Sequence, residues 1–82
     1  MRDATQILER IEHYRKIIKN SEKQAKVESE KLLAEIAKNV NDPIYIENWI
    51  DSWMREMKYC NAKINNHVEA IYILEWVLEI LE

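Results

Sequence analysis

Two histidines and one cysteine are the side chains of this 82-residue chain that are best suited to metal binding or nucleophilic catalysis. His13 follows Glu9 by four residues, and on a helix such a pair is ordinarily a surface charge pair. His67 follows Cys60 by seven residues, so a dimer could gather these residues from two chains around zinc, which accepts both ligand types. A single polar residue in a helix-packing seam more often fixes register or partner choice. We therefore expect His67 to be a satisfied core residue and predict no metal site.

The remaining patterns of enzymes are also missing. Di-iron bundles place a glutamate three residues before each histidine, but this chain has Arg10 and Ile64 at those positions. Cys60 falls in the predicted seam, where a thiol is an inert small hydrophobe. No pair of carboxylates lies within an apolar run, as acid–base chemistry would require. P-loops, dinucleotide-binding turns and nucleophile elbows need glycine, and the chain has none. We predict a protein that is not an enzyme, with no catalytic residue and no cofactor.

Composition indicates a helical, folded chain. Sheets need glycine and proline at turns, whereas this sequence has no glycine and a single proline. Hydrophobic residues make up 48% and the net charge is −3, which does not fit the disorder signature of low hydrophobicity and high charge. No apolar run approaches the roughly 20 residues of a membrane span, the N-terminus lacks the apolar core of a secretory signal, and a lone cysteine fits a reducing compartment. We expect an all-α cytoplasmic protein with no membrane partner.

The only strong interruption lies between Asn39 and Pro43. Proline is favourable at the first position of a helix, and Asp42 before it is a good N-cap. The asparagines before Asp42 suit a helix C-terminus because asparagine tolerates positive φ. Near the N-terminus, Asp3 and Gln6 match a capping box. The sequence therefore predicts a single domain, a long antiparallel helical hairpin, with helix 4–39, turn 40–42 and helix 43–81.

The second half carries a heptad repeat over more than five heptads, typical of a long helix packed at a shallow angle. Every position but His67 is apolar or nearly so. The a positions are Ile50, Met57, Ile64, Ile71 and Leu78, and the d positions are Ile46, Trp53, Cys60, His67, Leu74 and Leu81.

The first half allows two interpretations, because few apolar residues lie between Asn20 and Leu32. A break at Asn20 would give three helices, with a fresh cap formed by the residues that follow it. In a continuous helix, this stretch would instead contact the second helix through small side chains. In an antiparallel hairpin with a turn at 41–42, the numbers of two facing residues add up to about 83. This register places Ala25 and Ser29 opposite Trp53 and its neighbours. Because small residues facing large ones interdigitate, this register favours continuity.

The C-terminal segment holds more apolar surface than a hairpin can bury. Beyond the seam lie five candidate partner-binding residues: Tyr72, Ile73, Trp76, Val77 and Ile80. One interpretation is homodimerisation into a four-helix bundle. Another is a docking surface for a different protein with Trp76 and Tyr72 as anchors, since such aromatics dominate interface hot spots. An interfacial membrane helix is disfavoured because the polar edge is acidic.

Three aromatic residues follow one another at single-turn spacing near the turn: Tyr45, Trp49 and Trp53. Such a ridge most often belongs to a core or a dimer contact, and less often to a recognition surface. We include all three among the candidate partner-binding residues.

Charge is divided unevenly between the halves, with a balance of +2 over residues 1–41 and −5 over residues 42–82. Four lysines share one face of the first helix and form a candidate anion-binding stripe: Lys16, Lys19, Lys23 and Lys26. A solvated face is the usual explanation. Binding of nucleic acid or another phosphate-bearing ligand is the alternative, which the acidic net charge weakens because such affinity comes from neutralising phosphates.

These patterns together favour a small non-enzymatic protein that acts by binding, and so inhibiting or regulating, another macromolecule through an apolar helix face. A nucleic-acid or phosphate binder and a purely structural self-assembly unit are the alternatives. The richness in isoleucine, lysine, asparagine and glutamate also suits an accessory protein of an AT-rich genome, such as that of a phage or mobile element.

Overall fold

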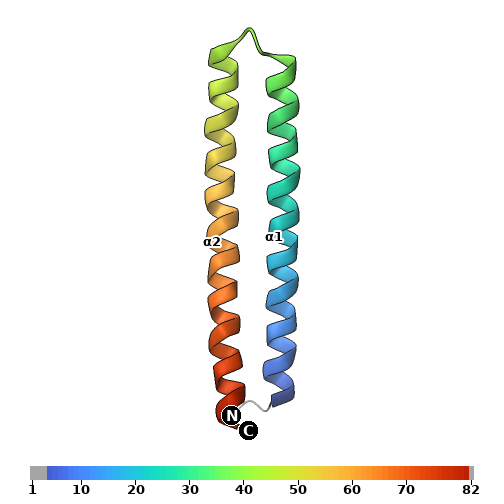
Figure 1. The fold of residues 1–82 in the computed structure, drawn as a ribbon, viewed down its shortest axis with the longest axis vertical. Coiled ribbons are helices and arrows are strands. Elements are labelled where there is room, and N and C mark those ends of the chain that lie inside the picture. The colour runs from blue at the N-terminus through green and yellow to red at the C-terminus, as the bar shows by residue number, and fades with distance from the viewer. Residues whose placement is uncertain (1–3, 82) are drawn as a thin grey trace.

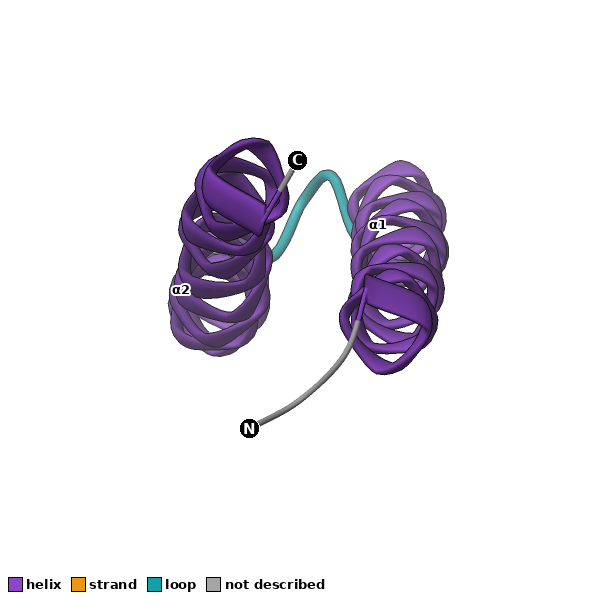
Figure 2. Ribbon diagram, turned by 90° about the horizontal axis from the view of Figure 1, so that it is seen from below, coloured by secondary structure: helices purple, strands orange, loops and turns teal. Residues whose placement is uncertain are grey.

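The computed structural model describes residues 4–81 as two long antiparallel helices, α1 (Ala4–Lys38) and α2 (Pro43–Leu81) (Figure 1). The hairpin measures 61 × 15 × 14 Å. Seen end-on, the helices lie side by side and form a single layer (Figure 2). The prediction of an all-α helical hairpin is confirmed. Helix α1 runs without a break through Asn20, as the packing of small against large residues favours, and it ends one residue before the predicted position.

The turn is held by hydrogen bonds from both helix ends. Asp42 caps α2, because its Oδ1 accepts from the Tyr45 N–H at 3.1 Å and its carbonyl accepts from the Ile46 N–H at 3.1 Å. The end of α1 differs from the expectation, since no described residue has a positive φ. Instead the Glu35 carbonyl oxygen accepts from both the backbone N–H and the side-chain amide of Asn39, at 3.1 and 2.9 Å. The predicted cap at Asp3 lies outside the described residues.

The heptad stripe of α2 faces α1, and every predicted seam residue is buried or half-buried except Leu81 at the helix end. The best-buried cluster is Ile7, Ile11 and Ile71, which are 4%, 3% and 7% exposed. It lies where the start of α1 meets the last part of α2, at the end of the hairpin opposite the turn. We call this the open end. Half-buried residues pack against the cluster: Tyr14, Ile18, Leu74, Val77 and Leu78.

The middle of the seam confirms the predicted register. Trp53 Nε1 donates to Ser29 Oγ at 3.0 Å, and Ser29 Oγ in turn donates to the Ala25 carbonyl oxygen at 2.8 Å. The indole thus packs over the small residues of α1 and finds a polar partner there, as a half-buried tryptophan N–H requires. Ser21 and Cys60 are both buried further along the seam.

Among the described residues, neither helix contains a stretch both apolar and long enough to cross a lipid bilayer.

Candidate protein-interaction surface

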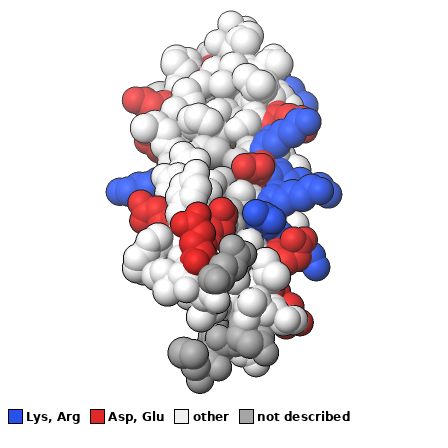
Figure 3. Space-filling model, turned by 60° about the horizontal axis from the view of Figure 1, so that its bottom comes forward, with Lys and Arg blue, Asp and Glu red and all other residues white. Residues whose placement is uncertain are grey.

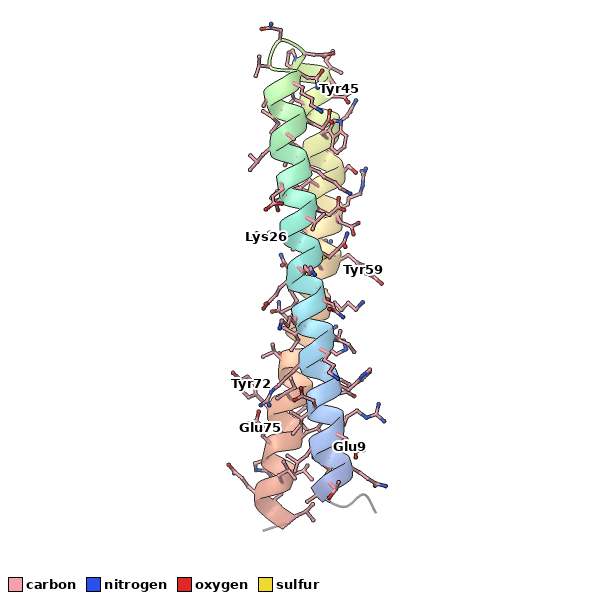
Figure 4. The ribbon with its side chains drawn as sticks, turned by 90° about the vertical axis from the view of Figure 1, so that its right-hand side faces the viewer. Glu9, Lys26, Tyr45, Tyr59, Tyr72 and Glu75 are labelled. Carbon is pink, nitrogen blue, oxygen red and sulfur yellow. The ribbon has the colours of Figure 1, made fainter. Side chains whose placement is uncertain are left out.

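Four large apolar side chains of α2 are exposed near the open end: Tyr72 (67%), Ile73 (61%), Trp76 (61%) and Ile80 (62%). We call these four residues the C-terminal face. At 3.6 residues per turn they fall on one side of α2, opposite the stripe that contains Ile71 and Leu74. Figure 4 shows Tyr72 pointing outward from the hairpin. Near the open end, α2 is therefore apolar both on the side that faces α1 and on the side that faces solvent.

The fifth residue predicted for this surface lies elsewhere. Val77 is half-buried and packs against the Ile7, Ile11 and Ile71 cluster, so it contributes to the core. An ionic contact borders the C-terminal face, since Arg15 Nη2 lies 4.0 Å from Glu75 Oε1. Both side chains are about half exposed, and a pair of this kind adds little stability. The face is thus a compact apolar area bordered by an ion pair.

The predicted aromatic ridge is divided between seam and surface. Trp53 is half-buried against Ser29. Tyr45 is 39% exposed, and its hydroxyl lies 3.2 Å from Glu35 Oε2, to which it donates. The Tyr45 and Trp49 rings lie 6.5 Å apart, tilted by 56°. Most of the ridge therefore contributes to packing of the hairpin.

A hollow of about 260 Å³ opens beside the ridge, near the turn. It is lined by Tyr45, Asn48, Trp49 and Ser52. These positions are i, i+3, i+4 and i+7 of one helix, which is the arrangement that receives a single side chain from a facing helix in knobs-into-holes packing. Four positions at this spacing can receive a side chain from another helix.

The lysine stripe is fully on the surface. Lys16, Lys19, Lys23 and Lys26 are all exposed, and within residues 4–81 none lies within ion-pair distance of a carboxylate. Figure 3 shows basic side chains gathered on the α1 side of the molecule, with acidic side chains among them. The stripe is an exposed face on which basic and acidic side chains are mixed.

The histidines and the cysteine do not converge. The ring of His67 meets that of Tyr14 edge-on at 5.2 Å, and its Nδ1 lies 2.6 Å from the Lys63 carbonyl oxygen. This is the environment of a satisfied seam histidine. His13 is exposed on α1 and Cys60 is buried. Across the described part of the chain, no three residues of the types that ligate metals lie together.

Two strongly exposed residues of α2 were not among the predicted site residues. Ile44 is 72% exposed and Tyr59 is 70% exposed. Figure 4 shows Tyr59 projecting from the hairpin on the side opposite Tyr72. Both lie off the heptad stripe, so the repeat itself indicates their exposure. Exposed apolar residues of α2 thus also lie away from the C-terminal face.

No family model, curated protein or solved structure matches this chain. Its function is therefore inferred from its exposed surfaces.

Proposed function

We propose that this chain is a non-enzymatic protein-interaction protein that binds another polypeptide through the C-terminal face. The observation that carries the proposal is the exposure of Tyr72, Ile73, Trp76 and Ile80, each above 60%, on one side of one helix. Taking 150–250 Å² for each large side chain, they present about 500 Å² of apolar surface. The largest apolar patch of an ordinary monomer is about 300–600 Å² and is often functional.

The chemistry of the face favours a protein partner. Tryptophan and tyrosine contribute most strongly to protein interfaces because they bury a large rigid area at low entropic cost. The exposed carboxylate of Glu79, next to Ile80, would repel phosphate groups of nucleic acid or anionic lipid. The partner that this surface fits is thus an apolar helix or groove.

Dimerisation belongs to the same proposal. Five hydrophobic side chains are buried within residues 4–81, while thirteen large ones are exposed. Two helices seldom bury enough apolar area to offset the ordering entropy of a chain of this length. Association of two hairpins, four helices in all, would bury part of that surface.

A single substitution tests the proposed function. Trp76→Ala removes the largest side chain of the face, and Leu33→Ala, at a 65% exposed position on α1, is the matched control. Tagged protein carrying each change is used for affinity capture from native lysate, with circular dichroism confirming equal helicity. We expect one specific polypeptide to be retained by the unmodified chain and by Leu33→Ala, and to be lost with Trp76→Ala. Equal retention by all three would refute the proposal.

A further inference from the structure

Helix α2 carries a protruding side chain near one end and a hollow near the other. Trp76 is 61% exposed close to the open end. The hollow of about 260 Å³ between Tyr45 and Ser52 lies close to the turn. In an antiparallel pair of helices the end of one lies beside the beginning of the other, so the two features of identical chains would meet. We infer that a second copy of this chain occupies the C-terminal face, with α2 antiparallel to α2 and each Trp76 inserted into the partner's hollow.

This insertion fixes the register of the pair. Asn48 and Trp49 are the middle two of the four positions that line the hollow. Placing Trp76 opposite the partner's Asn48 makes the numbers of facing residues add up to about 124. Residue 62 then lies on the two-fold axis and faces itself. Ala62 is exposed and small, and small residues allow close approach of two helix backbones. The same register places Ile80 opposite the partner's Ile44, which is 72% exposed.

One charged pair, Arg55 with Glu69, supports this register independently of the apolar contacts. Arg55 and Glu69 lie seven residues on either side of Ala62, so each faces the opposite charge of the partner chain. Both are exposed, and within the described residues neither forms an ion pair in the single hairpin. By two-fold symmetry the contact occurs twice.

A parallel arrangement of two copies is disfavoured. It would place every residue of the outer side beside its own copy. Arg55, Lys58 and Glu69 would then each meet an identical charge, which is destabilising at an interface. The antiparallel register replaces two of these repulsions with the attractive pair of Arg55 and Glu69, and it places Lys58 near the uncharged Asn66 of the partner.

A shorter antiparallel overlap, with only the two C-terminal faces in contact, is disfavoured by area. The face presents about 500 Å², whereas a stable interface buries about 800 Å² on each partner. Overlap of residues 44–80 extends the contact to about 55 Å of helix at 1.5 Å per residue. The lysine stripe lies on α1, outside the contact between the two α2 helices. The inference rests on the proposed function and names a second copy as the polypeptide that the face binds.

Cross-linking of single-cysteine variants tests the arrangement. Cys60→Ser removes the native thiol, and three positions of the outer side are then changed one at a time: Ala62→Cys, Arg55→Cys and Glu69→Cys. Each variant is treated alone with a short bis-maleimide. Arg55→Cys is also treated in a mixture with a tagged Glu69→Cys. Ala34→Cys, at an exposed alanine of α1, measures collisional cross-linking. Circular dichroism establishes that each variant remains helical.

The inferred register predicts that Ala62→Cys cross-links to itself several-fold above Ala34→Cys. Arg55→Cys and Glu69→Cys should cross-link to each other in the mixture and not when alone, because the two copies of either residue lie about 21 Å apart along the axis. Self-cross-linking of Arg55→Cys or Glu69→Cys would show a parallel pair and overturn the inference. Cross-linking of Ala62→Cys at the level of Ala34→Cys would overturn it too. If capture from lysate still depends on Trp76 in that case, the proposed function stands and only the second copy is wrong.

Discussion

Two isoleucines of α2, two residues apart, should respond very differently to the same substitution. Ile71 is 7% exposed and belongs to the open-end core, whereas Ile73 is 61% exposed on the C-terminal face. Ile71→Ala should destabilise the single hairpin strongly. Ile73→Ala should leave the stability of the single hairpin almost unchanged and weaken self-association. Because the chemical change is identical, the comparison isolates the environment of each side chain.

The expected magnitudes follow from burial. Isoleucine to alanine removes three carbon atoms, worth about 2.4 kcal/mol when fully buried. At Ile71 nearly all of this is lost and a cavity is added, so the free energy of unfolding should fall by about 2–4 kcal/mol. At Ile73 about 40% of the transfer term applies, roughly 1 kcal/mol, and the higher helix propensity of alanine offsets part of it. The net loss there should be about 0.5 kcal/mol.

Urea unfolding followed by circular dichroism measures both effects, at a protein concentration low enough to keep the chain monomeric and again at high concentration. In dilute solution only Ile71→Ala should lower the unfolding midpoint markedly. In concentrated solution Ile73→Ala should also lose stability relative to the unmodified chain, because association stabilises the folded state by mass action. If Ile71→Ala does not fold, Ile71→Val should still lose about 0.5–1.5 kcal/mol. Equal losses for Ile71→Ala and Ile73→Ala in dilute solution would refute the assignment of core and surface.

Three further changes test other parts of the structure. Ser29→Ala removes the acceptor of the Trp53 N–H and should cost about 1–2 kcal/mol in urea unfolding, since that donor stays half-buried; an unchanged midpoint would show that water replaces the hydroxyl. Asp42→Ala removes the oxygen that accepts from the Tyr45 N–H and should cost about 1 kcal/mol in thermal unfolding, and no loss would mean that Asp42 is dispensable as a cap. A labelled oligonucleotide should show no change in anisotropy at low salt, because the chain is acidic overall; salt-dependent binding that Lys23→Glu weakens would favour the lysine stripe as the functional site.

The hairpin and its register could be predicted because they depend on spacing alone. The heptad repeat places Trp53 on the seam, and the position of the turn then decides which residue of α1 it meets. That residue is Ser29, and the hydrogen bond between them agrees with the prediction. The end of α1 could not be predicted in the same way. Asn39 suits a left-handed backbone as well as a side-chain cap, and only the coordinates distinguish the two.

The composition of the C-terminal face was predicted in part. Apolar residues occur around the whole circumference of the helix over residues 72–80, which is more than one seam can bury. Four of the five predicted residues are exposed. Val77 lies next to the seam in the heptad, and whether such a flanking residue turns inward depends on how closely the helices approach. The hollow beside Tyr45 depends on side-chain conformations, so residue spacing alone did not reveal it.

The open end of the hairpin links folding to association. Helix α2 packs Ile71 inward and presents Trp76 outward within little more than one turn, so any partner on the outer side restrains the helix that completes the core. The turn end has no comparable core cluster, since Leu32 is the one buried apolar residue of α1 in that half. An antiparallel copy places the better-packed end of each chain against the less well-packed end of the other. Occupation of the hollow by Trp76 would therefore stabilise the turn end, which has the greater need of support.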